Sequence, residues 1–214
     1  MKPIAIYGAG GFGKEVATVI QKINEKATSW DLVGFFDDGL PKGTPVSKYG
    51  LTLGGKDELN DWPHHLAIVF AIGSPNTIKK VLEGIKNEKI DYPNIIHPEV
   101  YFADKETLRI GKGNVIVRGC SFSVDVTLGD FNQMNSLSAL AHDVSVGSFN
   151  VFMPLTRISG SVSIGDHNFF GINAIVLQNI KIGANTRIGA NSVVMRHTKD
   201  HYLYLGNPAR KMKL

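Results

Sequence analysis

Apolar side chains recur at every sixth residue through the second half of the chain. Stepping by six from Ile110 gives a series that is apolar throughout: Ile116, Phe122, Leu128, Met134, Leu140, Val146, Phe152, Ile158, Ile164, Phe170, Val176, Ile182, Ile188 and Val194. At an apolar content of 43%, independent placement has a probability of about one in 10⁵. Every third position precedes a glycine, from Ile110-Gly111 to Ile182-Gly183, so the full repeat is 18 residues.

This period predicts three short strands per turn of a triangular parallel β-helix, with the six-step residues filling its interior. Asparagines recur at the same 18-residue interval and would stack from coil to coil: Asn114, Asn132, Asn150 and Asn168. A sandwich of alternating strands also buries apolar residues, but it does not require an 18-residue register. We therefore expect residues 99–214 to form a β-helix domain with a C-terminal tail.

The first 98 residues lack this period. Short apolar runs at residues 3–7, 32–36 and 66–72 predict strands. Helices are predicted after the first and third runs, where apolar residues recur at helical spacing: Val16, Val19, Ile20 and Ile23, then Ile78, Val81, Leu82 and Ile85. The alternation indicates a small parallel sheet in an α/β domain over residues 1–98.

A glycine-rich turn, Gly8-Ala9-Gly10-Gly11-Phe12-Gly13, lies between the first predicted strand and helix. Glycines let the backbone approach a phosphate, and the start of a helix favours anions. The acidic pair Asp37-Asp38 follows the second strand at the spacing expected for a contact to a sugar or base hydroxyl. These features favour a nucleotide site over a purely structural turn. Fewer than 100 residues is short for a two-halved dinucleotide fold, so NAD is the weaker candidate.

Composition narrows the range of partners. With 20% charged residues and a net charge of +4, the chain has one basic cluster, the tail Arg210-Lys211-Met212-Lys213. A mildly basic chain favours small anionic ligands and argues against nucleic acid. The single cysteine, Cys120, excludes an intrachain disulfide and fits a reducing cytoplasm. The N-terminal apolar run is too short for a signal peptide, and no run approaches the ~18 apolar residues of a membrane span.

His142 is the candidate catalytic residue. It follows the interior Leu140 by two positions, a phase that points outward at a corner of the prism. One coil away on either side are Val124 and Gly160, which do not need an imidazole beside them. A histidine oriented by a carboxylate, here Asp143, is a usual general base, although an exposed histidine without a role is the competing interpretation. Adjacent strand residues point to opposite faces, so Asp143 reaches the ring only if the corner bends the backbone; otherwise it is a turn residue.

Other chemistries have weaker support. Cys120 occupies an interior phase, where a thiol is inert packing. No serine–histidine–aspartate arrangement can be read from the spacing. A histidine metal site needs several imidazoles at one ion, but the coils contain only His142 and His167, which do not share a corner. We therefore expect no metal, and a β-helical carbonic anhydrase is disfavoured.

Together these motifs resemble the sugar O-/N-acyltransferases of the hexapeptide-repeat class, which include bacterial nucleotide-amino-sugar acetyltransferases and sialic-acid O-acetyltransferases. The resemblance covers essentially the whole chain and is carried by YGAGGFGK at residues 7–14, Phe36-Asp37-Asp38, Ala71-Ile72-Gly73, Ile96-His97-Pro98, Ala141-His142-Asp143, Phe170-Gly171-Ile172-Asn173 and Gly206-Asn207-Pro208-Ala209-Arg210. It implies a small Rossmann-like α/β domain followed by a left-handed parallel β-helix of hexapeptide repeats. It also implies a homotrimer with acetyl-CoA between adjacent prisms.

The resemblance implies roles for individual residues. His142 would be the proton acceptor, and Asp143 would raise its basicity. The nucleotide of the sugar donor would contact Gly10, Gly11, Phe12, Asp37, Asp38 and Gly73. Acetyl-CoA, the expected co-substrate, would contact Ile172, Ala190, Asn207 and Pro208, with Val151 near its thioester. Many relatives have a histidine in place of Val151, so the role of that histidine is not transferred to this chain.

The expected activity is N-acetylation of a UDP-, dTDP- or GDP-linked 4-amino-4,6-dideoxyhexose, by direct transfer, in the cytoplasm and within polysaccharide biosynthesis. Three alternatives stay open. The acceptor could be a sugar hydroxyl, as in sialic-acid O-acetylation. The chain could be a nucleotide-sensing or scaffolding trimer without activity. An NAD-dependent oxidoreductase is motivated only by the glycine motif.

Overall fold

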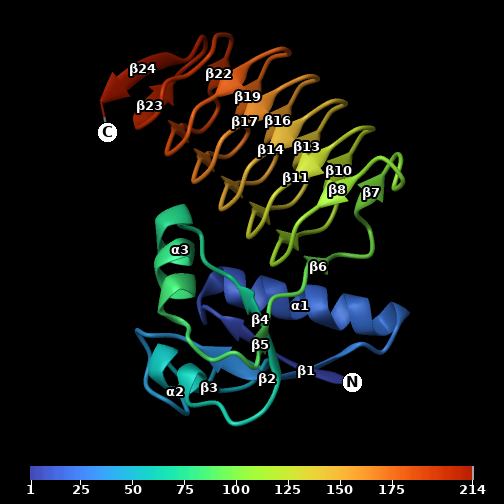
Figure 1. The fold of residues 1–214 in the computed structure, drawn as a ribbon, viewed down its shortest axis with the longest axis vertical. Helices are drawn as coiled ribbons and strands as arrows, with labels where there is room; N and C mark the ends of the chain where they lie inside the picture. Colours follow the sequence, from blue (N-terminus) through green and yellow to red (C-terminus); the bar gives the residue numbers. More distant parts are fainter. Residues whose placement is uncertain (214) are drawn as a thin grey trace.

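The computed structural model describes residues 1–213. An α/β domain forms one end of the molecule, and a column of stacked coils extends from it to the C-terminus (Figure 1). The helices of the α/β domain are α1 (Gly11–Lys26), α2 (Lys56–Asn60) and α3 (Pro75–Gly84). Its strands are β1 (Lys2–Tyr7), β2 (Trp30–Phe36), β3 (Thr52–Gly54), β4 (Leu66–Phe70) and β5 (Ile90–Asp91).

The five strands form one parallel sheet in the order β3-β2-β1-β4-β5. This order starts at the centre and moves outward in both directions, which is the Rossmann-like arrangement that the sequence predicted. The third predicted strand was too long, because Ala71 and Ile72 already belong to the turn that leads into α3. Strand β3 and helix α2 were not predicted, since each is too short to show a hydrophobic period.

The column is a solenoid of two-residue strands, three to a coil. They are β6 (Ile95–Ile96), β7 (Tyr101–Phe102), β8 (Arg109–Ile110), β9 (Val115–Ile116), β10 (Ser121–Phe122), β11 (Thr127–Leu128), β12 (Gln133–Met134), β13 (Ala139–Leu140), β14 (Ser145–Val146), β15 (Val151–Phe152), β16 (Arg157–Ile158), β17 (Ser163–Ile164), β18 (Phe169–Phe170), β19 (Ile175–Val176), β20 (Lys181–Ile182), β21 (Arg187–Ile188) and β22 (Val193–Val194). A terminal hairpin follows, formed by β23 (Tyr202–Leu205) and β24 (Arg210–Lys213).

These strands form three sheets, one for each side of the triangle. The domain-facing sheet contains β6, β9, β12, β15, β18, β21, β23 and β24. The open sheet contains β7, β10, β13, β16, β19 and β22, and the polar sheet contains β8, β11, β14, β17 and β20. Strands pair in parallel with the strand 18 residues further on, as in Ser145↔Ser163 and Val146↔Ile164, so the predicted repeat is confirmed.

The interior of the prism contains the six-step apolar residues. From Ile116 to Val194 every member of that series is buried, and all of them belong to one apolar cluster. Cys120 is buried among them, as its phase predicted, and burial raises the pKa of its thiol to about 11. A thiol with such a pKa is protonated at neutral pH and acts as packing.

A ladder of buried asparagines runs along one corner of the interior. The side-chain oxygen of each asparagine accepts a hydrogen bond from the backbone N–H of the residue one coil further on, at 2.7–2.9 Å. The ladder comprises Asn94, Asn114, Asn132, Asn150, Asn168 and Thr186. The ladder residues from Asn114 to Thr186 are fully buried, so the side chains replace water at backbone donors that have no other partner.

The outer side of the domain-facing sheet packs against the α/β domain. Val115 joins the apolar cluster of α1, and Val151 joins the cluster of β1 and β4. Strand β6 lies next to α1 and pairs with β9, so the first coil is built onto the domain. A division of the chain between residues 98 and 99 stays a prediction.

An aromatic stack marks the edge of this contact. Phe131, Phe149 and His167 occupy the same corner in three successive coils, with ring centroids 5.4 and 4.9 Å apart. Tyr92, in the connection from β5 to β6, packs edge-on against Phe131 and flat on Phe70. Burial raises the pKa of Tyr92 to about 12 and lowers the pKa of His167. The stack therefore attaches the coils to the domain through neutral rings.

Within residues 1–213 no helix is both long enough and apolar enough to cross a membrane. The longest one, α1, has 16 residues and an amphipathic pattern with one buried face.

The asparagine ladder leads to a prediction about stability. Replacing Asn150 with alanine leaves the buried backbone N–H of Asn168 without its acceptor. We expect the free energy of unfolding to fall by about 1–3 kcal/mol, the cost of an unsatisfied buried donor. Denaturant unfolding followed by circular dichroism measures the change. Ser145→Ala, at an exposed position in the same coil, is the control, and an equal effect of both substitutions would contradict a specific role for the ladder.

Candidate functional site

His142 and Asp143 lie together at the corner between the open sheet and the polar sheet. Asp143 has a left-handed backbone conformation, with φ of 58°, that turns its carboxylate back towards the preceding ring. His142 Nδ1 lies 2.7 Å from Asp143 Oδ2, and the side chains are 58% and 57% exposed. The bend that the sequence analysis required is therefore present, and the ring lies outside the prism.

This contact sets the hydrogen-bonding roles of the imidazole. An ionised Asp143 can only accept, so Nδ1 carries the hydrogen and Nε2 of the neutral ring is left as an acceptor. Nε2 has no partner among the described residues. The pair can therefore take a proton from a molecule bound at this corner.

The same corner leads towards a basic pocket. The 18-residue register continues from His142 through Gly160 and Gln178 to Arg196, three coils further along. At about 4.8 Å per coil, Arg196 lies roughly 14 Å from His142. Arg196 lines a cavity of about 370 Å³ together with Pro208 and further basic side chains: His197, Lys199, Arg210 and Lys211.

The predicted acetyl-CoA residues lie elsewhere on the prism. Ile172 and Ala190 are exposed and stacked on each other at the corner between the domain-facing and open sheets. Asn207 and Pro208 are exposed in the turn of the terminal hairpin. Val151 is fully buried against the α/β domain. Within one chain the open sheet separates Ile172 from His142, so the structure does not bring these predicted residues together.

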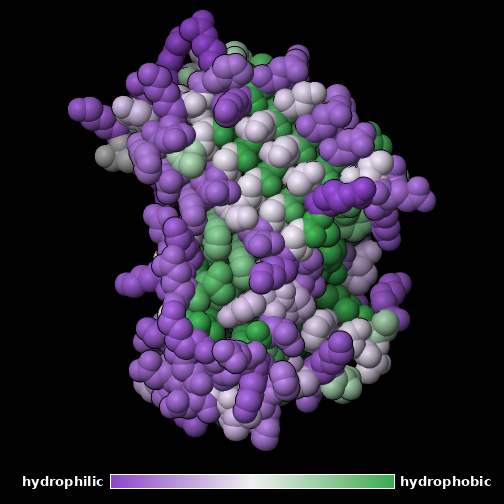
Figure 2. All heavy atoms as spheres, viewed as in Figure 1, coloured by the Kyte–Doolittle hydropathy of each residue, from purple (hydrophilic) through white to green (hydrophobic). Residues whose placement is uncertain are grey.

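The open sheet carries most of the exposed apolar surface of the solenoid. On the face seen in Figure 2, apolar and weakly polar atoms form parallel rows across the coils, and hydrophilic atoms gather at the margins. The large exposed apolar side chains of the coils all belong to this sheet or its two corners: Tyr101, Val124, Leu137, Leu155, Ile172 and Met195. The outward residues of the polar sheet are instead Arg109, Thr127, Ser145, Ser163 and Lys181.

The glycine turn combines tight packing with open space. A Cβ at Gly13 would lie 2.0 Å from the carbonyl oxygen of Gly8, so the helix packs closely on the strand. A Cβ at Gly10, Gly11 or Gly73 would meet no atom within 4 Å. Helix α1 has no acidic residue in its first turn and no side-chain cap, so its N-terminus is available to an anion. The predicted nucleotide residues therefore border open space, with Phe12 half-buried beside them.

The two aspartates that follow β2 are already hydrogen-bonded to the protein. Asp37 accepts from the backbone N–H groups of Ala9 and Gly39, at 2.8 and 2.9 Å. Asp38 accepts from the Tyr7 hydroxyl at 2.7 Å and from the backbone N–H of Lys56 at 2.8 Å. Both carboxylates thus hold the glycine turn and the start of α2 in place, and only their remaining lone pairs can contact a ligand.

Tyr7 and Lys56 were missed by the sequence analysis. Tyr7 is almost fully buried, and this burial, followed by the hydrogen bond to Asp38, raises its pKa well above the usual range. Its hydroxyl therefore stays a donor to the carboxylate. Lys56, together with both aspartates, lines a small cavity of about 300 Å³ beside the glycine turn. No motif marks either residue, because their roles depend on where β3 and α2 lie.

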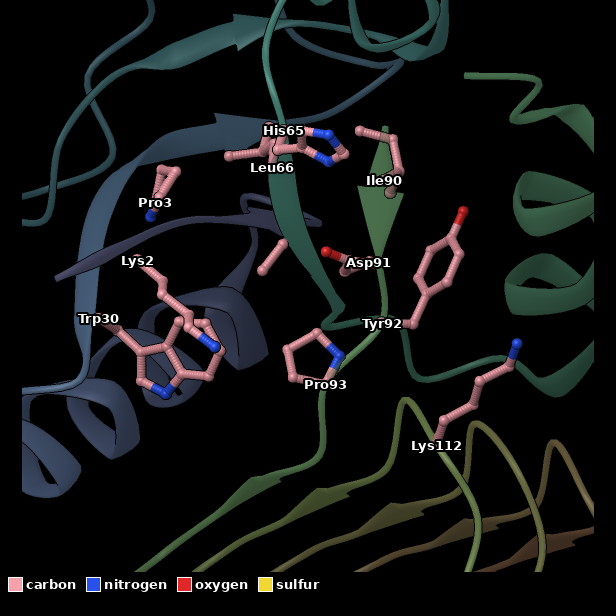
Figure 3. A pocket seen from close by; sticks show the side chains of 11 residues that line it. Lys2, Pro3, Trp30, His65, Leu66, Ile90, Asp91, Tyr92, Pro93 and Lys112 are labelled. Atoms are coloured by element: carbon pink, nitrogen blue, oxygen red, sulfur yellow. The ribbon is translucent and has the colours of Figure 1, made fainter. Parts of the chain in front are cut away.

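The largest cavity, about 590 Å³, lies at the opposite edge of the α/β sheet. Figure 3 shows Trp30, Tyr92 and Pro93 around it, with Lys2 and Lys112 at its sides. It is formed at the amino ends of β1, β2, β4 and β5, whereas the glycine turn follows the carboxyl end of β1. It contains none of the predicted site residues. Among residues 1–213 no cluster of three or more metal-type ligands occurs.

Two family models match the sequence. The PglD N-terminal domain matches residues 3–85, and the bacterial transferase hexapeptide model, with six repeats, matches residues 161–196. No curated protein sequence matches the chain. The two matched segments coincide with the Rossmann-like sheet and with the last coils of the solenoid. The resemblance drawn from the motifs is thereby confirmed.

Solved structures match the chain over almost its full length. The acetyltransferase domain of PglB from Neisseria gonorrhoeae FA1090, in complex with acetyl coenzyme A, is 25% identical with a TM-score of 0.88, and the match covers 99% of each chain. WeeI from Acinetobacter baumannii AYE is 25% identical with a TM-score of 0.88, covering 99% of this chain and 100% of WeeI. PerB from Caulobacter crescentus, in complex with CoA and GDP-perosamine, is 24% identical with a TM-score of 0.87, covering 99% and 98%.

The packing of the glycine turn leads to a second prediction. Gly13→Ala forces a methyl group into the carbonyl oxygen of Gly8, and we expect it to lower the free energy of unfolding by about 1–3 kcal/mol. Gly11→Ala, in the same helix start but facing open space, should leave stability unchanged or raise it slightly. Thermal unfolding of the two variants measures the contrast. Equal behaviour would mean that the strand and helix do not need this close approach.

Proposed function

Because the chain joins a PglD N-terminal domain to bacterial transferase hexapeptide repeats, we propose that it transfers an acetyl group from acetyl-CoA to the amine of a nucleotide-linked amino sugar. The solved relatives that match end to end include acetyltransferases bound to acetyl coenzyme A, or to CoA and GDP-perosamine. The observation that carries the proposal is the contact of His142 Nδ1 with Asp143 Oδ2 on the outside of the prism.

The proposed mechanism uses this pair as the general base. The neutral amine of the sugar attacks the thioester carbonyl carbon while His142 Nε2 removes its proton. Asp143 holds the ring through Nδ1 and stabilises the positive charge that the ring gains. The tetrahedral intermediate then collapses, the C–S bond breaks, and the CoA thiolate leaves and is protonated. The backbone N–H of Gly160, one coil from His142 and without an acceptor in the described chain, is the candidate donor to the oxyanion.

The acceptor is proposed to be a 4-amino-4,6-dideoxyhexose linked to GDP, UDP or dTDP. The open space at Gly10, Gly11 and Gly73 and the uncapped start of α1 support a diphosphate at the glycine turn. Asp37 and Asp38 would fix this turn and offer their free lone pairs to a ribose or base. We place the reaction in a reducing cytoplasm, where Cys120 stays a free thiol, and in polysaccharide biosynthesis.

Acetyl-CoA is proposed to lie along the corner column of His142. The basic pocket around Arg196 would bind the phosphates of CoA, about 14 Å from the imidazole, a separation that an extended pantetheine arm spans. Pro208, predicted from the resemblance, lines this pocket. Val151 is buried in the monomer, so its predicted contact near the thioester requires the surroundings of Val151 to open.

A homotrimer would complete the site. Ile172 and Ala190 lie at one corner of the open sheet and His142 lies at the other, so a single chain cannot place them around one ligand. In a cyclic trimer the corner of one chain faces the opposite corner of the next. The exposed apolar side chains on the open sheet and its corners support burial of this surface between chains.

The function is tested with the His142→Ala variant and a panel of acceptors. We expect turnover of one nucleotide amino sugar to fall by about 10²–10⁴, the contribution of a positioned base, with stability unchanged because the ring is exposed. The panel contains amine-bearing GDP-, UDP- and dTDP-sugars beside free sialic acid, with CoA release as the readout. Wild-type turnover by the variant would exclude the histidine mechanism, and acetylation of sialic acid alone would replace the amine by a hydroxyl.

The shared site is tested by mixing two inactive chains. His142→Ala removes the base, and Ile172→Arg blocks the proposed acetyl-CoA contact at the other corner. When both are co-expressed with different tags, about one quarter of the interfaces in random cyclic trimers combine an intact His142 with an intact Ile172. We expect about that share of wild-type activity in mixed trimers and none in either variant alone. A complete lack of activity in verified mixed trimers would place each site within one chain.

A further inference from the structure

The imidazole of His142 lies directly against a residue without a side chain. A Cβ at Gly160, one coil further on, would be 2.5 Å from both Cε1 and Nε2 of the ring and 3.1 Å from Nδ1. These are the three closest atoms to that position, and all belong to His142. The ring therefore occupies the space that a side chain at residue 160 would fill.

The backbone does not require glycine at this position. Gly160 is not among the residues with positive φ, so an L-amino acid can adopt its conformation. The same place in the corner is taken by Val124 one coil before His142 and by Gln178 one coil after Gly160. Glycines elsewhere in the coils differ, because a Cβ at Gly171 would strike backbone atoms of residues 189 and 190. At Gly160 only the imidazole excludes a methyl group.

We propose that the missing side chain of Gly160 positions the catalytic base, by letting the His142 ring lie flat against the next coil with Nδ1 on Asp143. This inference rests on the proposed function and adds a positioning residue to it. Carbon atoms in contact lie about 3.5–4.0 Å apart, so a methyl group at residue 160 displaces the ring by about 1 Å. The 2.7 Å hydrogen bond to Asp143 does not survive such a shift.

The contact also explains how an exposed side chain has a defined position. His142 lies on the surface, where side chains normally exchange between rotamers. The carboxylate of Asp143 fixes one nitrogen, and the backbone of Gly160 supports one face of the ring. A displacement of about 1 Å at a reacting group can lower a rate by about 10².

The test is Gly160→Ala, alone and combined with His142→Ala. We expect the single variant to fold as stably as wild type and to lose roughly 10- to 100-fold in kcat with little change in KM. In the His142→Ala background the same substitution should have no further effect, because no ring is left to displace. Gln178→Ala, in the same column but outside the listed contacts of the ring, is the control and should leave kcat unchanged.

A spectroscopic readout separates this proposal from the proposed function. Nitrogen-15 NMR of the histidine rings reports whether His142 Nδ1 carries the hydrogen that Asp143 accepts. We expect this signature in wild type and its loss in Gly160→Ala. An unchanged signature, a wild-type kcat, or a full loss of rate on top of His142→Ala would overturn the positioning role. If His142→Ala itself retains turnover, the catalytic proposal fails, and the NMR result still decides whether Gly160 holds the ring.

Discussion

The 18-residue register is the constraint on which the rest of the structure depends. Each coil is stabilised only by its neighbours, through parallel strand pairs outside and the asparagine ladder within. A shift by one residue would place the apolar series outside and each ladder amide against the wrong donor. Because the register is fixed, the corner residues are fixed as well, and His142, Gly160 and Gln178 fall in one column. The chemistry of the corner is thus a consequence of packing inside the prism.

Much of the fold could be predicted because it repeats. Fifteen positions in phase specified the coils, and the phase of His142 placed it outside before any coordinates were considered. Strand β3 and helix α2 could not be predicted, since three and five residues carry no period. The end of β4 was misjudged because Ala71 and Ile72 are as apolar as the strand that precedes them. Local composition cannot locate the point where a buried strand becomes a buried turn.

The candidate site was predicted unevenly for the same reason. Its motif residues were found, but their partners come from distant parts of the chain. Tyr7 reaches Asp38 across 31 residues, and the neighbour of the imidazole, Gly160, is 18 residues away and has no side chain to attract notice. The sequence also gave no sign that both aspartates are engaged by protein donors. A resemblance transfers residue identities, whereas the hydrogen bonds that decide what those residues can still accept depend on geometry.

The terminal hairpin has a consequence for how the molecule avoids polymerising. A solenoid that simply stopped would present unpaired backbone groups at its last coil, a template for another prism to stack end to end. Strand β24 runs antiparallel to β23 and covers that edge of the domain-facing sheet. Its own outer edge carries Arg210, Lys211 and Lys213, and like charges repel a second copy. The tail is thus a stopper against fibre growth, while the sides of the prism stay free to associate.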